Sequence, residues 1–151
     1  MKNFKLAMTL LGCSLMLTGF NRVYAGGVGY IDYGKVQEGY PLAQQAIKEV
    51  DAKALELQQF MVDKEKQYKS LDTPLKKQNF EEATSRELDA KQDEYIRLRN
   101  QKEETVYNNI QAAAKKVLVE QNLDIIVDYR VRFVGGVDVT NQVIQKLKSG
   151  I

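Results

Sequence analysis

The stretch that decides the fold is residues 42–74, LAQQAIKEVDAKALELQQFMVDKEKQYKSLDTP. Its apolar residues recur at alternating steps of four and three, which is the spacing of a helix that lies along a partner helix. The members of this stripe are Ala43, Ile47, Val50, Ala54, Leu57, Met61, Tyr68 and Leu71, with Lys64 as its one polar member. The repeat therefore predicts a long helix with a partner along its length.

The first helix is expected over about residues 42–69, and residues 70–74 predict a reversal of the chain. Asp72 or Thr73 can cap a second helix, because both side chains accept hydrogen bonds from free backbone N–H groups. Pro74 suits the first position of that helix, where its missing N–H is not needed. Residues 70–74 are thus the predicted tip of a hairpin.

The return helix, over about residues 75–120, is the longest predicted element and is sparsely apolar. From Arg99 to Thr105 it has no apolar residue at all. A helix this polar cannot be buried on several sides, so we expect a solvated arm whose last three turns alone reach a core. The predicted unit is an antiparallel, coiled-coil-like hairpin over residues 42–120.

The segments on either side of this hairpin predict short strands. Val28–Asp32 is interpreted as a strand and Tyr33–Gly39 as a short helix. Residues 123–134 alternate in period two with β-branched and aromatic side chains, which indicates one long strand or two short ones. Asp138 or Thr140 can then cap a closing helix. The apolar residues of that helix are Val143, Ile144 and Leu147.

The chain is therefore expected to be one α+β domain, residues 26–151, whose small β-sheet body comprises residues 26–41 and 121–151. So few strands are not stable alone in water, and one face of the sheet is wholly apolar and must be covered. The residues expected in an oligomeric body are Tyr30, Ile125, Val127, Tyr129, Val131 and Phe133. Self-association would cover both the sheet and the helical stripe, although pairing within one chain could cover the stripe alone.

Residues 1–25 are typical of a secretory signal peptide that is cleaved after Ala25. Two lysines precede an apolar run over residues 6–20, which is shorter than the ~20 residues that cross a bilayer. Lipoprotein processing at Cys13 is the alternative, because the residues before it loosely resemble a lipobox. Either way the chain is expected to be exported.

Cleavage would change the charge of the chain. The full chain has 22 basic and 20 acidic residues, and Lys2, Lys5 and Arg22 would leave with the signal peptide. The mature chain would then carry a net charge of −1, which does not support nucleic-acid binding.

Catalytic chemistry is not expected from this composition. The chain has no His, and Cys13 is its only Cys. The serines after the signal peptide, Ser70, Ser85 and Ser149, lack a nearby base of the usual kind. The glycines of residues 26–29 precede a strand and do not follow one, so they do not form a phosphate-binding loop. We therefore expect no enzyme, no cofactor and no metal site.

Basic residues gather around the predicted tip. They are Lys64, Lys66, Lys69, Lys76 and Lys77, against Asp63, Glu65 and Asp72. Two interpretations stay open, a solvated helix end and a weak electrostatic contact with anionic lipid or acidic partners. The sparse apolar residues of the arm leave a similar choice between packing inside the hairpin and touching a partner. They are Met61, Tyr68, Leu71, Phe80 and Tyr95.

Three segments, taken in order, carry a resemblance to a known family. Residues 28–32 look like its opening strand, and residues 32–41 match its D-x-x-K-V-x-x-x-Y-P pattern. Residues 123–128 look like its second strand, and residues 137–140 look like the start of its closing helix. With a charged hairpin between them, the segments resemble the Skp (OmpH) family of periplasmic chaperones.

The resemblance implies a homotrimer, in which three small sheets form a β-barrel-like core and three hairpins project as arms around a cavity. It implies a periplasmic holdase that binds unfolded outer-membrane proteins without ATP and prevents their aggregation. The alternative is a secreted coiled-coil spacer or adaptor of the cell envelope. Breadth of binding separates the two, because a chaperone protects several unrelated membrane proteins and an adaptor binds one partner.

Overall fold

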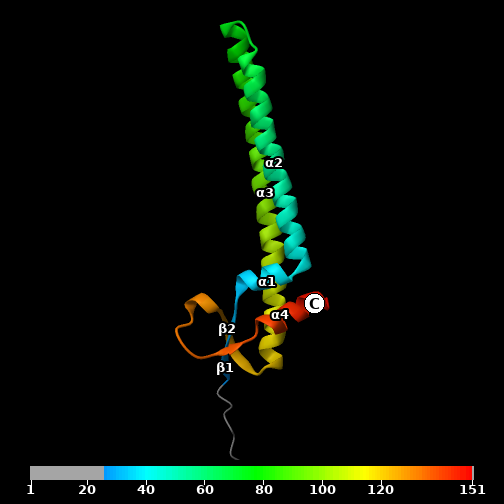
Figure 1. The fold of residues 1–151 in the computed structure, drawn as a ribbon, viewed down its shortest axis with the longest axis vertical. Helices are drawn as coiled ribbons and strands as arrows, with labels where there is room; N and C mark the ends of the chain where they lie inside the picture. Colours follow the sequence, from blue (N-terminus) through cyan, green and yellow to red (C-terminus); the bar gives the residue numbers. More distant parts are fainter. Residues whose placement is uncertain (1–25, 151) are drawn as a thin grey trace, which may run out of the picture.

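The fold is a long helical hairpin that stands on a small α+β body (Figure 1). The computed structural model describes residues 26–150, so the expected signal peptide and Cys13 lie outside the described residues. The strands are β1 (Gly27–Ile31), β2 (Leu123–Asp128) and β3 (Val137–Asp138). The helices are α1 (Tyr33–Gly39), α2 (Pro41–Lys69), α3 (Pro74–Glu120), the 3-10 turn η1 (Tyr129–Val131) and α4 (Thr140–Lys148).

α2 and α3 form the antiparallel hairpin that the apolar repeat predicts. They have 29 and 47 residues, so at 1.5 Å per residue they extend about 44 and 70 Å. A proline stands in the first turn of each helix, and the Thr73 hydroxyl caps α3 by accepting a hydrogen bond from the Lys76 N–H at 3.4 Å. The reversal lies at the predicted residues, with Thr73 as the cap.

The sheet has three parallel strands in the order β2-β1-β3. Val28 pairs with Ile125 and Tyr30 with Val127, so these four side chains share one face. Parallel neighbours need a long crossover connection, and here the whole hairpin makes the connection from β1 to β2. On the opposite face, a side chain at Gly29 would come within 2.7 Å of the Leu123 side chain, so the close packing there requires glycine.

The strand predicted over residues 123–134 is too long. β2 ends at Asp128, and the chain turns away through η1. The Asp128 carboxylate accepts hydrogen bonds from the Arg130 N–H at 2.9 Å and from Arg130 Nε at 2.8 Å, which stabilises a turn where the alternation predicted extended backbone. The residues that consequently leave the expected sheet face are Tyr129, Val131 and Phe133.

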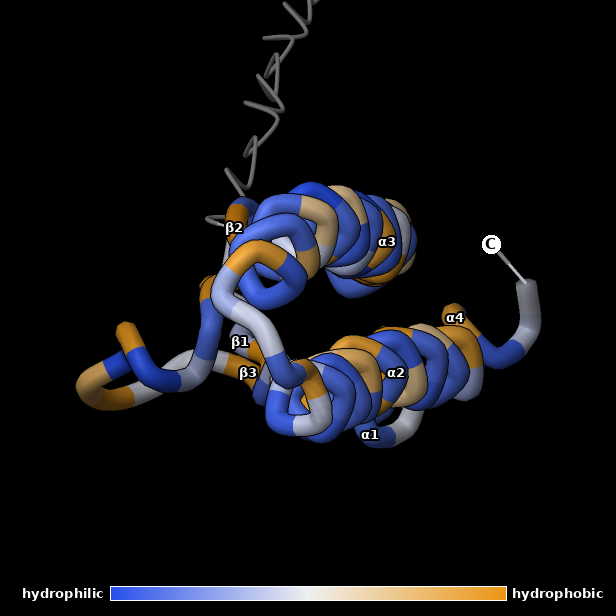
Figure 2. Tube along the Cα trace, turned by 90° about the horizontal axis from the view of Figure 1, so that it is seen from above, coloured by the Kyte–Doolittle hydropathy of each residue, from blue (hydrophilic) through white to orange (hydrophobic). Residues whose placement is uncertain are grey.

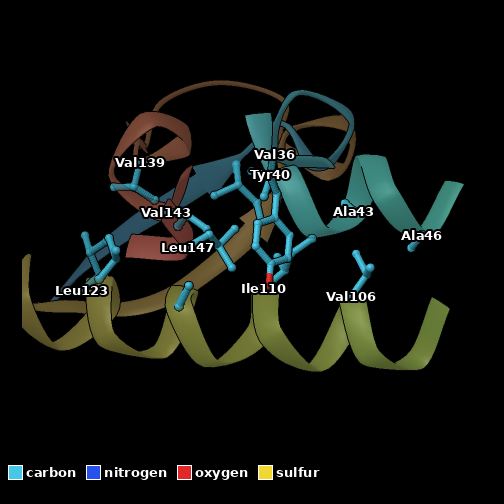
Figure 3. Close-up of a cluster of buried hydrophobic side chains, with 13 residues drawn as sticks. Val36, Tyr40, Ala43, Ala46, Val106, Ile110, Leu123, Val139, Val143 and Leu147 are labelled. Atoms are coloured by element: carbon cyan, nitrogen blue, oxygen red, sulfur yellow. The ribbon is translucent and has the colours of Figure 1, made fainter. Parts of the chain in front are cut away.

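The buried core lies where the body meets the root of the arm (Figure 3). As predicted, the last three turns of α3 reach it, through Ile110, Ala113 and Val117, and Val106, one turn earlier, reaches it as well. Val36 of α1, Val139, and Val143 of α4 pack with them and are fully buried. From residue 47 to residue 105, by contrast, no residue is buried, and polar residues cover most of both arm helices (Figure 2). The arm is therefore solvated along most of its length.

Hydrogen bonds connect β1, α1 and α4 around Thr140. The Thr140 hydroxyl accepts a hydrogen bond from the Asp32 N–H at 3.0 Å, and the Asp138 carboxylate accepts one from the Thr140 N–H at 2.9 Å. Hydrogen bonding to Thr140 lowers the pKa of Asp138. Asp32 in turn caps α1 by accepting from the Lys35 N–H at 3.1 Å. The N-cap of α4 is Val139, so neither predicted residue is at the cap position; Asp138 instead bonds the first N–H of the helix from one residue earlier.

Candidate functional site

The arm is the first candidate site, because most of its surface lies away from the core. Among the described residues three ion pairs join α2 to α3. They are Lys102 with Glu49, Lys53 Nζ with Glu94 at 3.0 Å, and Lys64 Nζ with Glu87 at 2.7 Å. The hydrogen bond between Lys53 and Glu94 raises the pKa of the lysine and lowers that of the glutamate. These pairs connect the two helices in the part of the arm where no residue is fully buried.

In the distal half of the arm, lysine and aromatic side chains fill the seam between the helices. Lys64 Nζ lies 5.1 Å from the centre of the Phe60 ring and 5.5 Å from that of Phe80. Lys91 Nζ lies 5.2 Å from the Phe60 ring centre, so Phe60 contacts a cation from each helix. Lysines over aromatic faces attract the rings while their ammonium groups stay near water. The seam is therefore amphipathic and has no dry core.

A groove of about 470 Å³ opens between α2 and α3 in this distal half, and we call it the distal groove. Its apolar lining residues are Phe60, Met61, Tyr68, Phe80 and Leu88. Thr84 also lines it, and the Thr84 hydroxyl oxygen is buried without a hydrogen-bond partner. A hydrogen bond between the Tyr68 hydroxyl and Glu81 raises the pKa of Tyr68. Three of the five apolar contact residues expected from the sequence thus meet here, whereas Leu71 lies at the tip and Tyr95 lies in α3 closer to the body.

A second groove, of about 150 Å³, lies near the root of the arm, and we call it the proximal groove. Ile47 and Val50 of α2 line it, together with Arg99 and Glu103 of α3. Both grooves were missed by sequence reasoning, which treated the apolar stripe as one continuous seam. Among the residues that line the two grooves, Ile47 and Met61 are 45% and 52% exposed.

Most of the predicted stripe on α2 is buried or half-buried, but the seam differs from the stripe at a few positions. Lys53 and Phe60, which the stripe omitted, are withdrawn between the helices, while Ile47 and Met61 lie at the edge of the seam. Residues 46, 53 and 60 repeat at seven-residue steps, and this second repeat is the signal that could have found the seam. This repeat is hard to recognise because its middle residue, Lys53, is charged. The aliphatic part of the Lys53 side chain packs between the helices while its ammonium group pairs with Glu94.

The five lysines expected at the tip differ in their surroundings. Lys64 and Lys77 lie over aromatic rings, the latter 5.3 Å from the centre of Tyr68. Lys66, Lys69 and Lys76 are exposed, and they pair with Asp63 at 3.7 Å, Glu65 at 2.5 Å and Asp72 at 2.9 Å. Between residues 60 and 88, six basic residues are matched by six acidic ones. Contact between this tip and anionic lipid or acidic partners stays a prediction.

The second candidate site is the sheet face turned away from the core. Val28 and Ile125 pair on this face and are about half exposed, and the Arg132 guanidinium stacks on the Tyr30 ring at 3.8 Å. Phe133 is fully exposed, on the loop that follows η1. A parallel sheet is normally covered on both faces, so this surface is unusually open for a protomer on its own. Its role in an oligomer stays a prediction.

The part of the chain between residues 26 and 150 holds no group of side chains suited to bind a metal ion. None of the helices described there has the length and apolar content needed to cross a membrane. The shifted pKa values of the arm belong to ion pairs and hydrogen bonds on its surface, such as the one between Arg99 and Glu103 at 2.9 Å.

Comparison with known protein families bears on the whole architecture. The family model described as outer membrane protein (OmpH-like) matches residues 27–147, from β1 to the end of α4. The chain belongs to this family. The resemblance drawn from the ordered sequence segments is thereby confirmed, and the OmpH-like match includes the hairpin as well as the body.

A solved structure shares the fold of this OmpH-like protein. It is the crystal structure of a candidate outer membrane chaperone (OmpH-like) from Caulobacter crescentus CB15. The two agree with a TM-score of 0.52 and 14% sequence identity, over 82% of this chain and 85% of the other. At this identity the match shows the fold alone. No curated protein matches the chain.

Proposed function

We propose that this OmpH-like protein is an ATP-independent holdase chaperone of the periplasm, which binds unfolded outer-membrane proteins and prevents their aggregation. The observation that carries the proposal is the arm, two long helices with no buried residue between 47 and 105 and with apolar grooves open to solvent. An arm of this kind offers many weak contacts to a flexible chain. Membership of the OmpH-like family and the description of the Caulobacter structure support the same role.

The working form is a homotrimer in this proposal. The open sheet face and the exposed loop after η1 are apolar surfaces that a protomer alone leaves in water, and neighbouring subunits would cover them in a β-barrel-like core. The three arms would then enclose a cavity in which a client is held. The expected signal peptide would direct the chain to the periplasm. Holding a client in such a cavity does not require ATP.

The direct test dilutes a denatured outer-membrane barrel protein from urea into buffer and follows aggregation by light scattering. The mature protein should suppress aggregation without ATP, with maximal protection near one trimer per small client. Several unrelated barrel proteins should be protected. Protection of one protein only would favour the adaptor function.

A shortened arm tests whether the arm is the binding element. Deleting residues 58–93 and joining the ends with a short glycine-containing turn removes the distal groove and the ion pair between Lys64 and Glu87. It keeps the ion pairs of Lys53 and Lys102, and it leaves the core untouched. The variant should assemble like the intact protein but lose most of its protection of clients. Full protection by the variant would place client binding on the body and favour the spacer or adaptor function.

A further inference from the structure

The two flanks of the hairpin differ. On one flank, ion pairs of Lys53, Lys64 and Lys102 cross from one helix to the other. On the other flank, no ion pair joins α2 to α3 among the described residues, and both the proximal and the distal groove lie there. The hairpin is thus crossed by ion pairs along one side, where a pocket of about 150 Å³ lined mostly by polar residues lies beside Glu49 and Lys102, and it has the two more apolar grooves along the other.

A single row of apolar residues runs along the open side of α2. Its members are Ile47, Ala54, Met61 and Tyr68. They are seven residues apart, so at 1.5 Å per residue the row extends for about 30 Å with a side chain about every 10 Å. Ile47 lines the proximal groove, and Met61 and Tyr68 line the distal groove. We call this row and its two grooves the open flank.

Most charged groups that line the two grooves have an ion-pair partner, whereas Asp51 and Glu81 have none among the residues that the structure describes. Arg99 pairs with Glu103 at 2.9 Å in the proximal groove, and Glu65 pairs with Lys69 beside the distal groove. Glu81 accepts the hydrogen bond of the Tyr68 hydroxyl. The lysines that line the grooves, Lys64 and Lys102, pair with Glu87 and Glu49 across the opposite flank. What the open flank offers a partner is therefore mainly apolar area, together with the two carboxylates of Asp51 and Glu81.

The pattern does not suit another helix of the same kind. Helices that pair along their length bury two apolar rows, at the a and d positions of a seven-residue repeat. Here the row next to the apolar one contains Asp51, Gln58 and Glu65, which are all exposed. A flexible segment that touches separate apolar points fits this surface better than a second copy of the arm.

We infer that the open flank is the surface with which each arm holds its client, and that it selects uncharged apolar segments of unfolded chains. This inference rests on the proposed holdase function. It orients the arms, because the open flanks must face the client and the ion-paired flanks must face away from it. It also predicts that this contact is insensitive to salt, since an uncharged segment makes no ionic attraction that salt could screen.

Residues on the same helix provide a matched control. Leu55 and Val62 lie on α2, are 65% and 39% exposed, and line neither groove. The test compares Ile47→Ser/Met61→Ser with Leu55→Ser/Val62→Ser, so that both proteins lose two exposed apolar side chains from one helix. Circular dichroism and sedimentation first establish that helicity and assembly are retained in each variant.

The probe is a fluorescent, uncharged peptide with alternating apolar residues, whose binding is followed by anisotropy. The open-flank variant should bind it roughly tenfold more weakly, while the control should stay within about twofold of wild type. Wild-type affinity should hold between about 50 and 500 mM salt. Equal losses in the two variants, or an affinity that falls steeply with salt, would overturn the inference.

A second measurement does not depend on loss of binding. In the mature protein, residues 26–151, which contains no cysteine, Met61→Cys and Val62→Cys can each be labelled with a benzophenone and irradiated with a denatured barrel protein. Crosslinks should form from position 61 and be weak from the adjacent position 62. Equal crosslinking at both positions contradicts the open flank but leaves the holdase function standing. A wild-type protein that neither binds nor protects any client refutes the proposed function itself.

Discussion

Among single residues, Thr140 connects parts of the body that are far apart in sequence. Its hydroxyl accepts from the Asp32 N–H at the end of β1, and its own N–H donates to Asp138. Two segments that are 108 residues apart in sequence are thus joined at one side chain, which is 5% exposed. The sequence predicted a capping role at this position, but the bond to Asp32 depends on the fold and could not be foreseen from spacing.

Replacing Thr140 with Val should lower the free energy of unfolding by about 1–3 kcal/mol, because the Asp32 N–H would be left without its acceptor. Thr140→Ser keeps the hydroxyl oxygen and should lower the free energy of unfolding clearly less than Thr140→Val does. Urea denaturation at one fixed protein concentration measures both, and the slope of the transition should not change. If Val and Ser proved equivalent, the hydrogen bond would not contribute to stability.

At the scale of the elements, the hairpin, β1 and the start of β2 were predictable, whereas the end of β2, the strand β3 and the parallel pairing were not. A seven-residue apolar repeat, two prolines and a Thr cap determine two helices and their reversal through local rules. The residues that enter the seam depend on how α2 and α3 are aligned along each other. The ion pair between Lys64 and Glu87 reflects this alignment, and the spacing of apolar residues within one helix does not reveal it. β2 was overestimated because the turn at Asp128 competes with an alternation that continues past it.

The exposed tip lysines allow a test at this scale. Replacing Lys66, Lys69 and Lys76 with Gln should leave stability nearly unchanged, because exposed ion pairs contribute little. Binding to anionic vesicles or acidic clients should weaken, most visibly at low salt. The matched control replaces three exposed lysines at the other end of the molecule, Lys115, Lys116 and Lys148. Vesicle flotation in which the two triple variants behave alike would make the tip a solvated helix end.

At the scale of the whole molecule, the core is small and lies at one end, whereas most of the chain is arm (Figure 1). The apolar residues that the protomer leaves exposed on its body include Val28, Ile125, Tyr129, Val131, Phe133 and Val134. The sequence indicated that this surface needs a cover, since alternation marks an apolar face. It did not indicate that Phe133 lies on a loop, since that depends on the turn after β2.

Phe133→Asp separates assembly from folding, because Phe133 is fully exposed in the protomer. The variant should keep its helicity, yet the trimer should dissociate, since a charge buried in an apolar interface without a partner costs several kcal/mol. Leu55→Asp, on the arm, is the control and should stay trimeric. Analytical ultracentrifugation at micromolar concentration distinguishes these states. A wild-type protein that sediments as a monomer would contradict the oligomer prediction from the outset.

The parallel pairing of β1 with β2 has a consequence for the order of folding. Gly27 must find Leu123, and closing a flexible loop of that length is entropically costly and slow. The hairpin reduces this entropic cost. Once α2 and α3 pair, starting from the tip, the residues that follow α3 lie next to those that precede α2, which brings β2 close to β1. The arm then promotes folding of the body, and the sheet should form after the hairpin. Helical turns could be added to or removed from the arm with little effect on this order of folding, provided that α2 and α3 are lengthened or shortened by the same amount.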